Sequence, residues 1–156
     1  MNKMPNQMLI IFGASGDLTA RKLVPALFNL YKGKHLPENF LVLGASRSDM
    51  SDEEFRSRVV GASSYLAEDV RREEASFIKG FAEKLFYHDL GSSYEEGYEA
   101  LASRIQSLDK EFRTDGNFIF YLSTPPEIYE LIAKNLCEQG LTDESHGWKR
   151  LIVEKP

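Results

Sequence analysis

Basic residues are in short supply in this sequence, and cysteine is almost absent. Among the 156 residues, 19 are Lys or Arg and 24 are Asp or Glu, which gives a formal net charge of -5. A protein that binds nucleic acid without sequence preference needs a basic face, so this balance argues against a nucleic-acid partner. An anionic ligand must instead be held by a few local groups.

The single cysteine, Cys137, has no partner in the chain for a disulfide, which suits a reducing cytoplasm. It lies in a helical pattern without a neighbouring histidine, so we expect no chemistry from it. Long apolar runs are also missing, since the longest falls well short of the roughly 20 residues that cross a bilayer. Residues 1–7 lack the apolar core of a signal peptide. We therefore expect a cytoplasmic protein without a membrane partner.

Short apolar runs, rich in Ile, Leu, Val, Phe and Tyr, are spaced along the whole chain. They are continuous rather than alternating, which indicates strands that are buried on both faces. Helical patterns separate them. This order predicts an α/β fold in which a doubly wound, mostly parallel sheet carries helices on both faces, as one domain over residues 1–156. The expected strands are 8–12, 40–45, 84–90, 117–123 and 150–155.

Helix signals lie between these strands. Ser51 and Ser93 each precede a glutamate by three residues, the spacing of a capping box. A third helix is expected to begin at Pro126 and to end at Gly140. The segment 59–84 is longer than one crossover needs and predicts two helices. Ligands of such sheets bind beyond the carboxyl ends of the strands, so functional residues should follow Phe12, Gly44, His88, Leu122 and Glu154.

A glycine turn follows the first strand, where residues 13–18 read Gly-Ala-Ser-Gly-Asp-Leu. Gly13 allows a sharp turn, and Gly16 lets a phosphate approach the backbone without meeting a Cβ. Backbone N–H groups and the positive end of a helix dipole would then face the phosphate. The same residues also suit a simple strand-to-helix turn capped by Ser15 or Asp17. The position on the first strand of an alternating pattern favours the phosphate site.

The second strand ends in Gly-Ala-Ser-Arg-Ser, which places Arg47 where an NAD-binding site usually has an acid. An arginine there can donate two hydrogen bonds to a 2′-phosphate and stack on adenine, whereas an acid would repel that phosphate. The sequence therefore predicts NADP in preference to NAD. Two alternatives stay open: Arg47 is simply solvated, or Asp49 or Asp52 reaches the ribose.

Four ordered stretches resemble the glucose-6-phosphate 1-dehydrogenase family. They are IFGASGDLTARKLVPALFNLY, GASRS, FYLSTPPEIY and GWKRLIVEKP, and together they span nearly the whole chain. Thr19 stands where the family usually has Ala. The resemblance implies the Rossmann-like NADP-binding domain of an oxidoreductase of the pentose phosphate pathway. In that reaction a hydride leaves C1 of glucose 6-phosphate for the nicotinamide, which yields 6-phosphogluconolactone.

The resemblance also implies roles for individual residues. Arg47 would hold the 2′-phosphate, Asp89 and Leu90 would lie beside the adenosine, and Lys22 would lie near the substrate. Lys155 would reach both the substrate and the nicotinamide, although by itself it is an ordinary charge at a strand end. Thr124, Pro125 and Tyr129 would line the passage to the nicotinamide. The pyrophosphate would be held by Gly13, Ala14, Ser15, Gly16, Asp17, Leu18, Thr19 and Ala20.

The catalytic base is missing from this set, and so is any metal site. Family members continue into a second domain that carries the sugar-phosphate site and a histidine base between Asp and Tyr. None of His35, His88 and His146 has these neighbours, so we expect the base beyond Pro156 and cofactor binding without turnover in this chain. The resemblance further implies a homo-oligomer that forms largely through the second domain, which leaves a monomer open for this chain.

Two other functions are alternatives to the dehydrogenase. A short-chain reductase or sugar epimerase needs a tyrosine with a lysine four residues later, and none of the seven tyrosines has one. A noncatalytic NADP-sensing domain would carry the same binding residues. The sequence up to Pro156 does not separate that domain from the coenzyme domain of a dehydrogenase.

Overall fold

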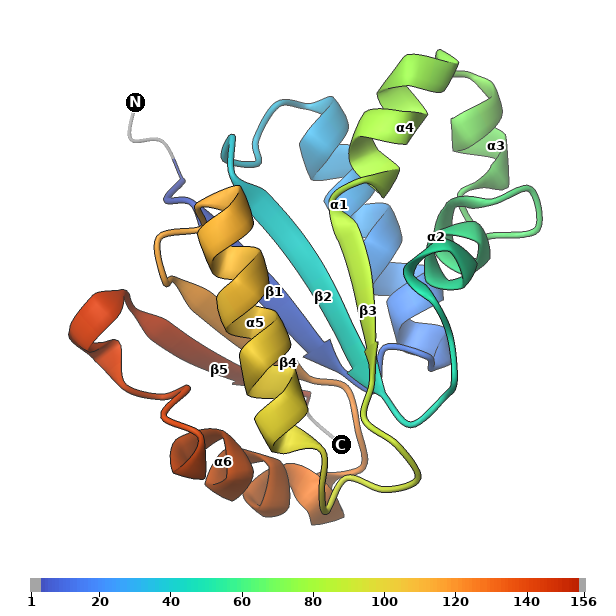
Figure 1. Cartoon of the computed structure of the whole chain (residues 1–156). Helices are drawn as coiled ribbons and strands as arrows, with labels where there is room; N and C mark the ends of the chain where they lie inside the picture. The colour runs from blue at the N-terminus through green and yellow to red at the C-terminus, as the bar shows by residue number, and fades with distance from the viewer. Residues whose placement is uncertain (1–3, 155–156) are drawn as a thin grey trace.

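Five parallel strands form one sheet in the computed structural model, which describes residues 4–154 (Figure 1). The order across the sheet is β3-β2-β1-β4-β5. The strands are β1 (Gln7–Phe12), β2 (Phe40–Ser46), β3 (Leu85–Asp89), β4 (Phe118–Leu122) and β5 (Lys149–Val153). The helices are α1 (Val24–Lys32), α2 (Asp52–Val60), α3 (Ala67–Arg71), α4 (Ala75–Ala82), α5 (Tyr98–Phe112) and α6 (Tyr129–Glu138), with short turns η1 (Thr19–Leu23), η2 (Pro126–Ile128) and η3 (Glu144–His146).

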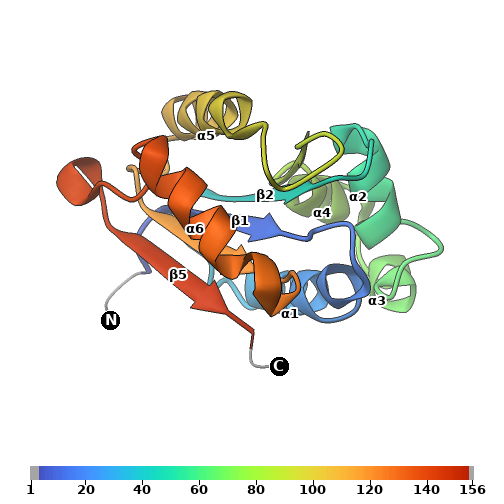
Figure 2. The same cartoon turned by 90° about the horizontal axis from the view of Figure 1, so that it is seen from below.

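Helices cover both faces of the sheet, and Figure 2 shows α5 and α6 on the face opposite α1. Met8, Ile10 and Phe12 of β1 are buried in a cluster with side chains of α5 and α6. Ile11 points the other way into a second cluster, which contains side chains of α1, α2 and α4. The predicted doubly wound α/β fold is confirmed. Within residues 4–154, no helix combines the length and apolar character that a bilayer crossing requires.

The strand order places a topological switch point beside β1. From β1 the chain moves through β2 to β3 on one side, and then returns to add β4 and β5 on the other side. Loops that leave β1 and β4 therefore diverge and open a crevice at the carboxyl edge. Phe12 pairs with Ala45 and with Leu122, so the residues that follow these three strand positions meet at one place.

Most helix signals proved correct. Ser51 caps α2, because its hydroxyl oxygen accepts the Glu54 N–H at 3.1 Å and the Glu54 carboxylate accepts the Ser51 N–H at 3.4 Å. The segment 59–84 contains two further helices, α3 and α4. The helix expected from Pro126 is divided into η2 and α6, and it ends two residues before Gly140.

The predicted start of α5 at Ser93 is wrong. The helix begins at Tyr98, and Gly97 before it has a φ of 90°. The Ser93 hydroxyl instead accepts the N–H of Glu95 in a short turn. An intervening loop buries Tyr94, whose side chain packs into the cluster under α5. Burial of that aromatic ring outweighs the local capping signal.

The two edges of the sheet differ. On β3, Asp52 accepts the N–H of Tyr87 at 2.7 Å, and the Arg56 guanidinium donates to the Leu85 carbonyl at 2.7 Å. Side chains of α2 thus satisfy edge groups that could pair with another strand. On β5, Leu151 is 52% exposed and Val153 is 49% exposed. The expectation that every strand is covered on both faces is wrong for β5, whose side chains belong to neither buried cluster, whereas Leu85 and Tyr87 of the opposite edge strand β3 are buried.

Candidate functional site

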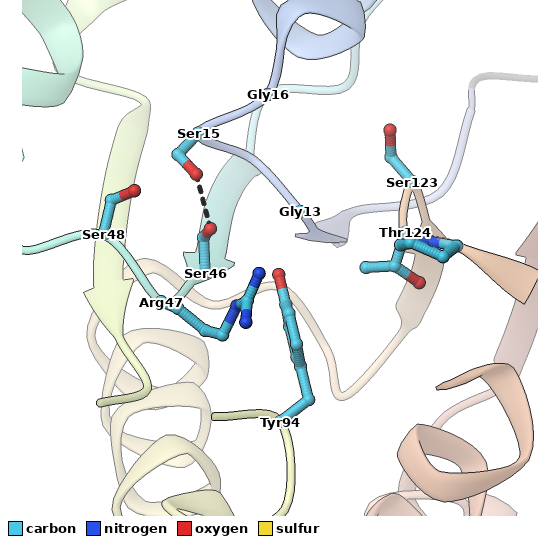
Figure 3. Close-up of a pocket in the computed structure, with 10 residues that line it drawn as sticks. Gly13, Ser15, Gly16, Ser46, Arg47, Ser48, Tyr94, Ser123 and Thr124 are labelled. Carbon is cyan, nitrogen blue, oxygen red and sulfur yellow. Dashed lines mark hydrogen bonds between the residues drawn. The ribbon is translucent and has the colours of Figure 1, made fainter. Parts of the chain in front are cut away.

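A cavity of about 310 Å³ opens at the carboxyl ends of β1, β2 and β4 (Figure 3). Several residues that the sequence singled out meet there, although they come from three separate loops. The predicted residues in its lining are Gly13, Ser15, Gly16, Arg47, Thr124 and Pro125; the others are Ser46, Ser48, Tyr94 and Ser123.

The glycine turn forms one wall of this cavity. Gly13 has a φ of 83°, and an added Cβ would overlap the carbonyl oxygen of Ser123, so only glycine fits the sharp turn without strain. Its N–H donates to the Ala45 carbonyl at 2.9 Å, and the Gly16 N–H donates to the Gly13 carbonyl at 3.0 Å. The N–H group of Ser15 donates to no described backbone acceptor. Asp17 and Leu18 begin the helical segment that follows, and the first N–H groups of a helix have no acceptor within it. These donors are available to an anion.

Side chains tie the turn to its surroundings. The hydroxyls of Ser15 and Ser46 are hydrogen-bonded at 2.6 Å, which joins the turn to the end of β2 (Figure 3). The Asp17 carboxylate forms an ion pair with Arg21 at 2.9 Å and accepts a hydrogen bond from the Tyr65 hydroxyl at 3.1 Å. Asp17 does not line the cavity. Its negative charge is therefore paired outside the space proposed for the phosphate.

Arg47 supplies the positive charge of the cavity. Its guanidinium carbon lies 5.3 Å from the centroid of the Tyr94 ring (Figure 3), a cation–π distance. The loop that carries it is held from behind, because the Tyr87 hydroxyl donates to the Ser48 carbonyl at 2.6 Å. Of the described residues that line the cavity, only Arg47 is charged. This local cation sits in a chain whose overall charge is negative.

The two acids that could have served a ribose lie elsewhere. Asp52 accepts the Tyr87 N–H at 2.7 Å and forms an ion pair with Arg104 at 3.0 Å. Its carboxylate is therefore bound to the edge strand β3 and to Arg104. Asp49 is exposed and does not line the cavity. The cavity lining thus contains an arginine at the end of β2 and no carboxylate in the part of the chain that the structure describes.

The loop after β4 forms the opposite wall. Ser123, Thr124 and Pro125 line the cavity there. The Thr124 hydroxyl oxygen is buried and has no hydrogen-bond partner among the described residues. A buried hydroxyl normally has a partner, so a polar atom of a ligand beside this loop would satisfy it. The Thr19 hydroxyl is likewise buried without a described partner, but Thr19 does not line the cavity.

Other predicted residues lie outside the cavity lining. The Asp89 carboxylate accepts the Gly91 N–H at 2.8 Å, and Leu90 is buried in the core beneath α5. Lys22 is exposed on η1. The Tyr129 hydroxyl donates to the Glu154 carbonyl at 3.0 Å, which anchors the chain just after β5. Lys155 lies outside the described residues, and Ala14, Leu18 and Ala20 are not among the residues that line the cavity.

Four lining residues were missed by the sequence argument. Ser46, Ser48 and Ser123 flank residues that were singled out, and the rule that ligands bind at strand ends would have found them. Tyr94 lies in a loop five residues after the end of β3. No pattern in the sequence marks it, because it reaches the cavity through the path of its loop.

None of the three histidines lines the cavity among the described residues. Burial lowers the pKa of His88, and the nearby positive charge of Arg104 lowers it further. His88 is therefore neutral near pH 7, and its position in β3 outside the cavity lining separates it from the proposed site. No group of three or more His, Cys, Asp and Glu side chains within residues 4–154 is arranged to hold a metal ion.

A doubly wound parallel sheet with a glycine turn at its switch point, free N–H donors and an arginine after the second strand defines a dinucleotide-binding domain. Comparison with known families narrows this class. The model of the family described as "Glucose-6-phosphate dehydrogenase, NAD binding domain" matches residues 10–156, and the chain belongs to this family.

Comparisons with individual proteins match the same family. The chain is 43% identical over 154 residues to glucose-6-phosphate 1-dehydrogenase of Aggregatibacter actinomycetemcomitans, covering 99% of the chain and 30% of that relative. The corresponding enzyme of Bacillus subtilis is 34% identical, with 99% and 30% covered. A solved structure of a glucose-6-phosphate dehydrogenase in complex with its substrate glucose 6-phosphate superimposes with a TM-score of 0.75 at 30% identity, covering 100% of this chain and 31% of the other. The chain thus spans about 30% of the length of these relatives.

Proposed function

We propose that this chain is the NADP-binding domain of a cytoplasmic glucose-6-phosphate 1-dehydrogenase. The observation that carries the proposal is the position of Arg47, the charged residue of a cavity that also contains the glycine turn. The exposed, free thiol of Cys137 is compatible with a reducing compartment. The activity of the whole protein is inferred from relatives about three times as long.

The preference for NADP over NAD follows from charge. A guanidinium at the end of β2 is attracted to a 2′-phosphate and can donate two hydrogen bonds to it. The hydroxyls of Ser46 and Ser48, which line the same part of the cavity, can add further donors. An NAD site would need a carboxylate for the ribose hydroxyls. Asp52 is engaged by Arg104 and Tyr87, and Asp49 is outside the lining.

We assign the rest of the cofactor to the glycine turn, to the Arg47–Tyr94 pair and to the loop after β4. The free N–H groups of the glycine turn would hold the pyrophosphate, and the turn presents no side chain at Gly13 or Gly16 that would block it. Tyr94 and Arg47 would hold the adenine, with Asp89 and Leu90 behind them in the same part of the fold. Thr124, Pro125 and Tyr129 would direct the nicotinamide end toward Lys22 and Lys155.

The proposed reaction is the oxidation of glucose 6-phosphate to 6-phosphogluconolactone. When bound, the nicotinamide of NADP+ accepts the hydride. The residues of this chain bind and orient the two reactants. No histidine of the described residues lines the cavity, so we assign the base that takes the C1 hydroxyl proton to a part of the enzyme outside this chain. From the family resemblance we further propose that the full enzyme is a homo-oligomer assembled largely through that part.

A second candidate is a noncatalytic domain that senses NADP. The absence of a histidine from the described cavity lining favours it for the chain considered by itself. The two candidates differ in what accompanies the chain rather than in how it binds the cofactor.

Titration calorimetry of the chain with NADP+ and with NAD+ tests the binding assignment. We expect tighter binding of NADP+, and equal affinities would contradict it. An assay for reduction of NADP+ by glucose 6-phosphate then separates the two candidates. The full-length protein should turn over, whereas the 156-residue chain alone should bind without turnover. A full-length protein that binds NADP+ but oxidises no sugar phosphate would favour the sensor.

A further inference from the structure

The glycine turn is held from a direction that the proposed cofactor does not occupy. Arg58, in the last turn of α2, donates from its guanidinium to the carbonyl oxygen of Ser15. Ser15 lies between the two glycines of the turn. This contact joins residues 43 positions apart in the sequence, and no sequence motif marks Arg58 for this role.

Arg58 lies outside the cavity that contains Arg47. It lines a separate hollow of about 270 Å³ together with Asp17, Ala20 and the segment 63–65. Arg58 therefore touches the turn without lining the space proposed for the ligand. A guanidinium in that position acts on a bound pyrophosphate through the backbone that it holds.

The helix that carries Arg58 is firmly anchored. Its first turn has the complete Ser51 capping box, and Phe55 and Val59 are fully buried. Asp52 and Arg56 bond to the β3 edge. The same helix begins shortly after Arg47, so α2 connects the loop of the proposed 2′-phosphate site to the turn of the proposed pyrophosphate site. Arg58 transmits this rigidity to Ser15.

The contact between Arg58 and Ser15 also affects which backbone groups of the turn can bind a ligand. A carbonyl oxygen that faced the ligand would repel a phosphate, whereas N–H groups attract it. Arg58 engages the carbonyl of Ser15, while the N–H group of Ser15 has no described backbone acceptor and those of Asp17 and Leu18 begin a helical segment. Holding the turn in this arrangement before binding reduces the ordering cost of association.

We propose that Arg58 is a positioning residue that preorganises the glycine turn for a dinucleotide pyrophosphate. The proposal rests on the proposed function for its ligand, but the ordering of the turn is a property of the free chain. Because the pyrophosphate is common to NADP and NAD, Arg58 supports both cofactors equally. Arg47, in contrast, discriminates between them.

The test compares Arg58→Met, which keeps the aliphatic stem, with Arg71→Met as a matched control. Arg71 is an exposed residue of α3 that pairs with Glu68, so its replacement removes the same charge from a neighbouring surface. In the ligand-free chain, Arg58→Met should speed amide exchange of the Gly16 N–H about threefold to tenfold, the range that one net hydrogen bond contributes. Arg71→Met should leave this exchange unchanged.

Binding supplies the second readout. Arg58→Met should weaken NADP+ and NAD+ by the same factor of about three to ten, and should leave the affinity for 2′-AMP, which lacks a pyrophosphate, unchanged. Arg58→Lys, which keeps a charged donor, should recover part of the loss. Unchanged exchange at Gly16, a loss confined to NADP+, or an equal loss for 2′-AMP would overturn the proposal. A wild-type chain that bound no dinucleotide would contradict the proposed function, whereas the exchange experiment would still report on Arg58.

Discussion

The Arg47 guanidinium lies over the ring of Tyr94, 5.3 Å from its centroid. The two residues follow different strands, and the ring is buried while the arginine is exposed. Tyr94 therefore restricts an otherwise mobile side chain and directs it toward the glycine turn (Figure 3). The proposed 2′-phosphate site depends on this pair rather than on Arg47 alone.

Replacement of Tyr94 by Leu should weaken NADP+ binding about tenfold, because Arg47 loses a cation–π contact worth about 0.5–2 kcal/mol and is no longer held for the 2′-phosphate. NAD+ binding should weaken less, so the preference for NADP+ should shrink. Tyr94→Phe, which keeps the ring, is the matched control and should bind both cofactors as the wild type does. Titration calorimetry measures all three, and an equal loss in Tyr94→Phe would show that the ring is not the supporting group.

Gly13→Ala should destabilise the fold and reduce dinucleotide binding. The substitution meets both a positive φ and the carbonyl oxygen of Ser123, so the free energy of unfolding should fall by about 2–4 kcal/mol. Gly140→Ala is the matched control, because Gly140 also has a positive φ but has open space around it. Its cost should be about 1 kcal/mol. Equal costs in urea unfolding would show that the close approach to Ser123 does not matter.

The stability of the chain should fall as the pH rises from about 10 toward 12. Burial, with a smaller contribution from Tyr94, raises the pKa of Tyr98 to about 12, whereas an unfolded tyrosine ionises near 10. The unfolded chain therefore releases its proton first, and the stabilisation present below pH 10 is lost through this window. Burial also raises the pKa of Tyr87, which adds to the same trend.

Tyr98→Phe provides the control for this pH dependence. It removes the hydrogen bond from the Tyr98 hydroxyl to the Tyr94 carbonyl, so stability at neutral pH should fall by about 1 kcal/mol. The decline above pH 10 should become shallower. The residual slope should then combine Tyr87 with Lys84 and Lys149, whose pKa values are lowered by burial and which act in the opposite direction. A variant whose decline matched that of the wild type in urea unfolding would show that Tyr98 does not titrate in this window.

Local patterns predicted where the strands lie because each strand is a continuous apolar run, but the same pattern did not predict how deeply β5 is buried. The Ser51 cap and the turn at Gly13 were predictable for the same reason, since each depends on neighbours in the chain. The start of α5 was not, because burial of Tyr94 by distant residues overrides the Ser93 signal. The exposure of β5 depends on which side chains pack against that strand, and this packing is a property of the whole fold.

The residues of the cavity likewise divide into those that local sequence predicts and those that depend on distant contacts. Arg47 and the glycine turn follow strand ends, where the fold class itself directs attention. Tyr94 and Arg58 act on them through contacts across the fold, and neither lies in a motif. Groups at strand ends are therefore predictable from the sequence, whereas Tyr94, which is also proposed to hold the adenine, and Arg58 are identified only by contacts across the fold.

The most direct test of the account is the ratio of the Kd for NAD+ to the Kd for NADP+, measured by calorimetry for the wild-type chain and for Arg47→Ala. The wild type should favour NADP+ by about tenfold or more, since a charge-assisted hydrogen bond contributes about 1.5–3 kcal/mol. In Arg47→Ala the ratio should fall to about one, through loss of NADP+ affinity with little change for NAD+. A variant that kept the wild-type ratio would contradict the assignment of Arg47 to the 2′-phosphate.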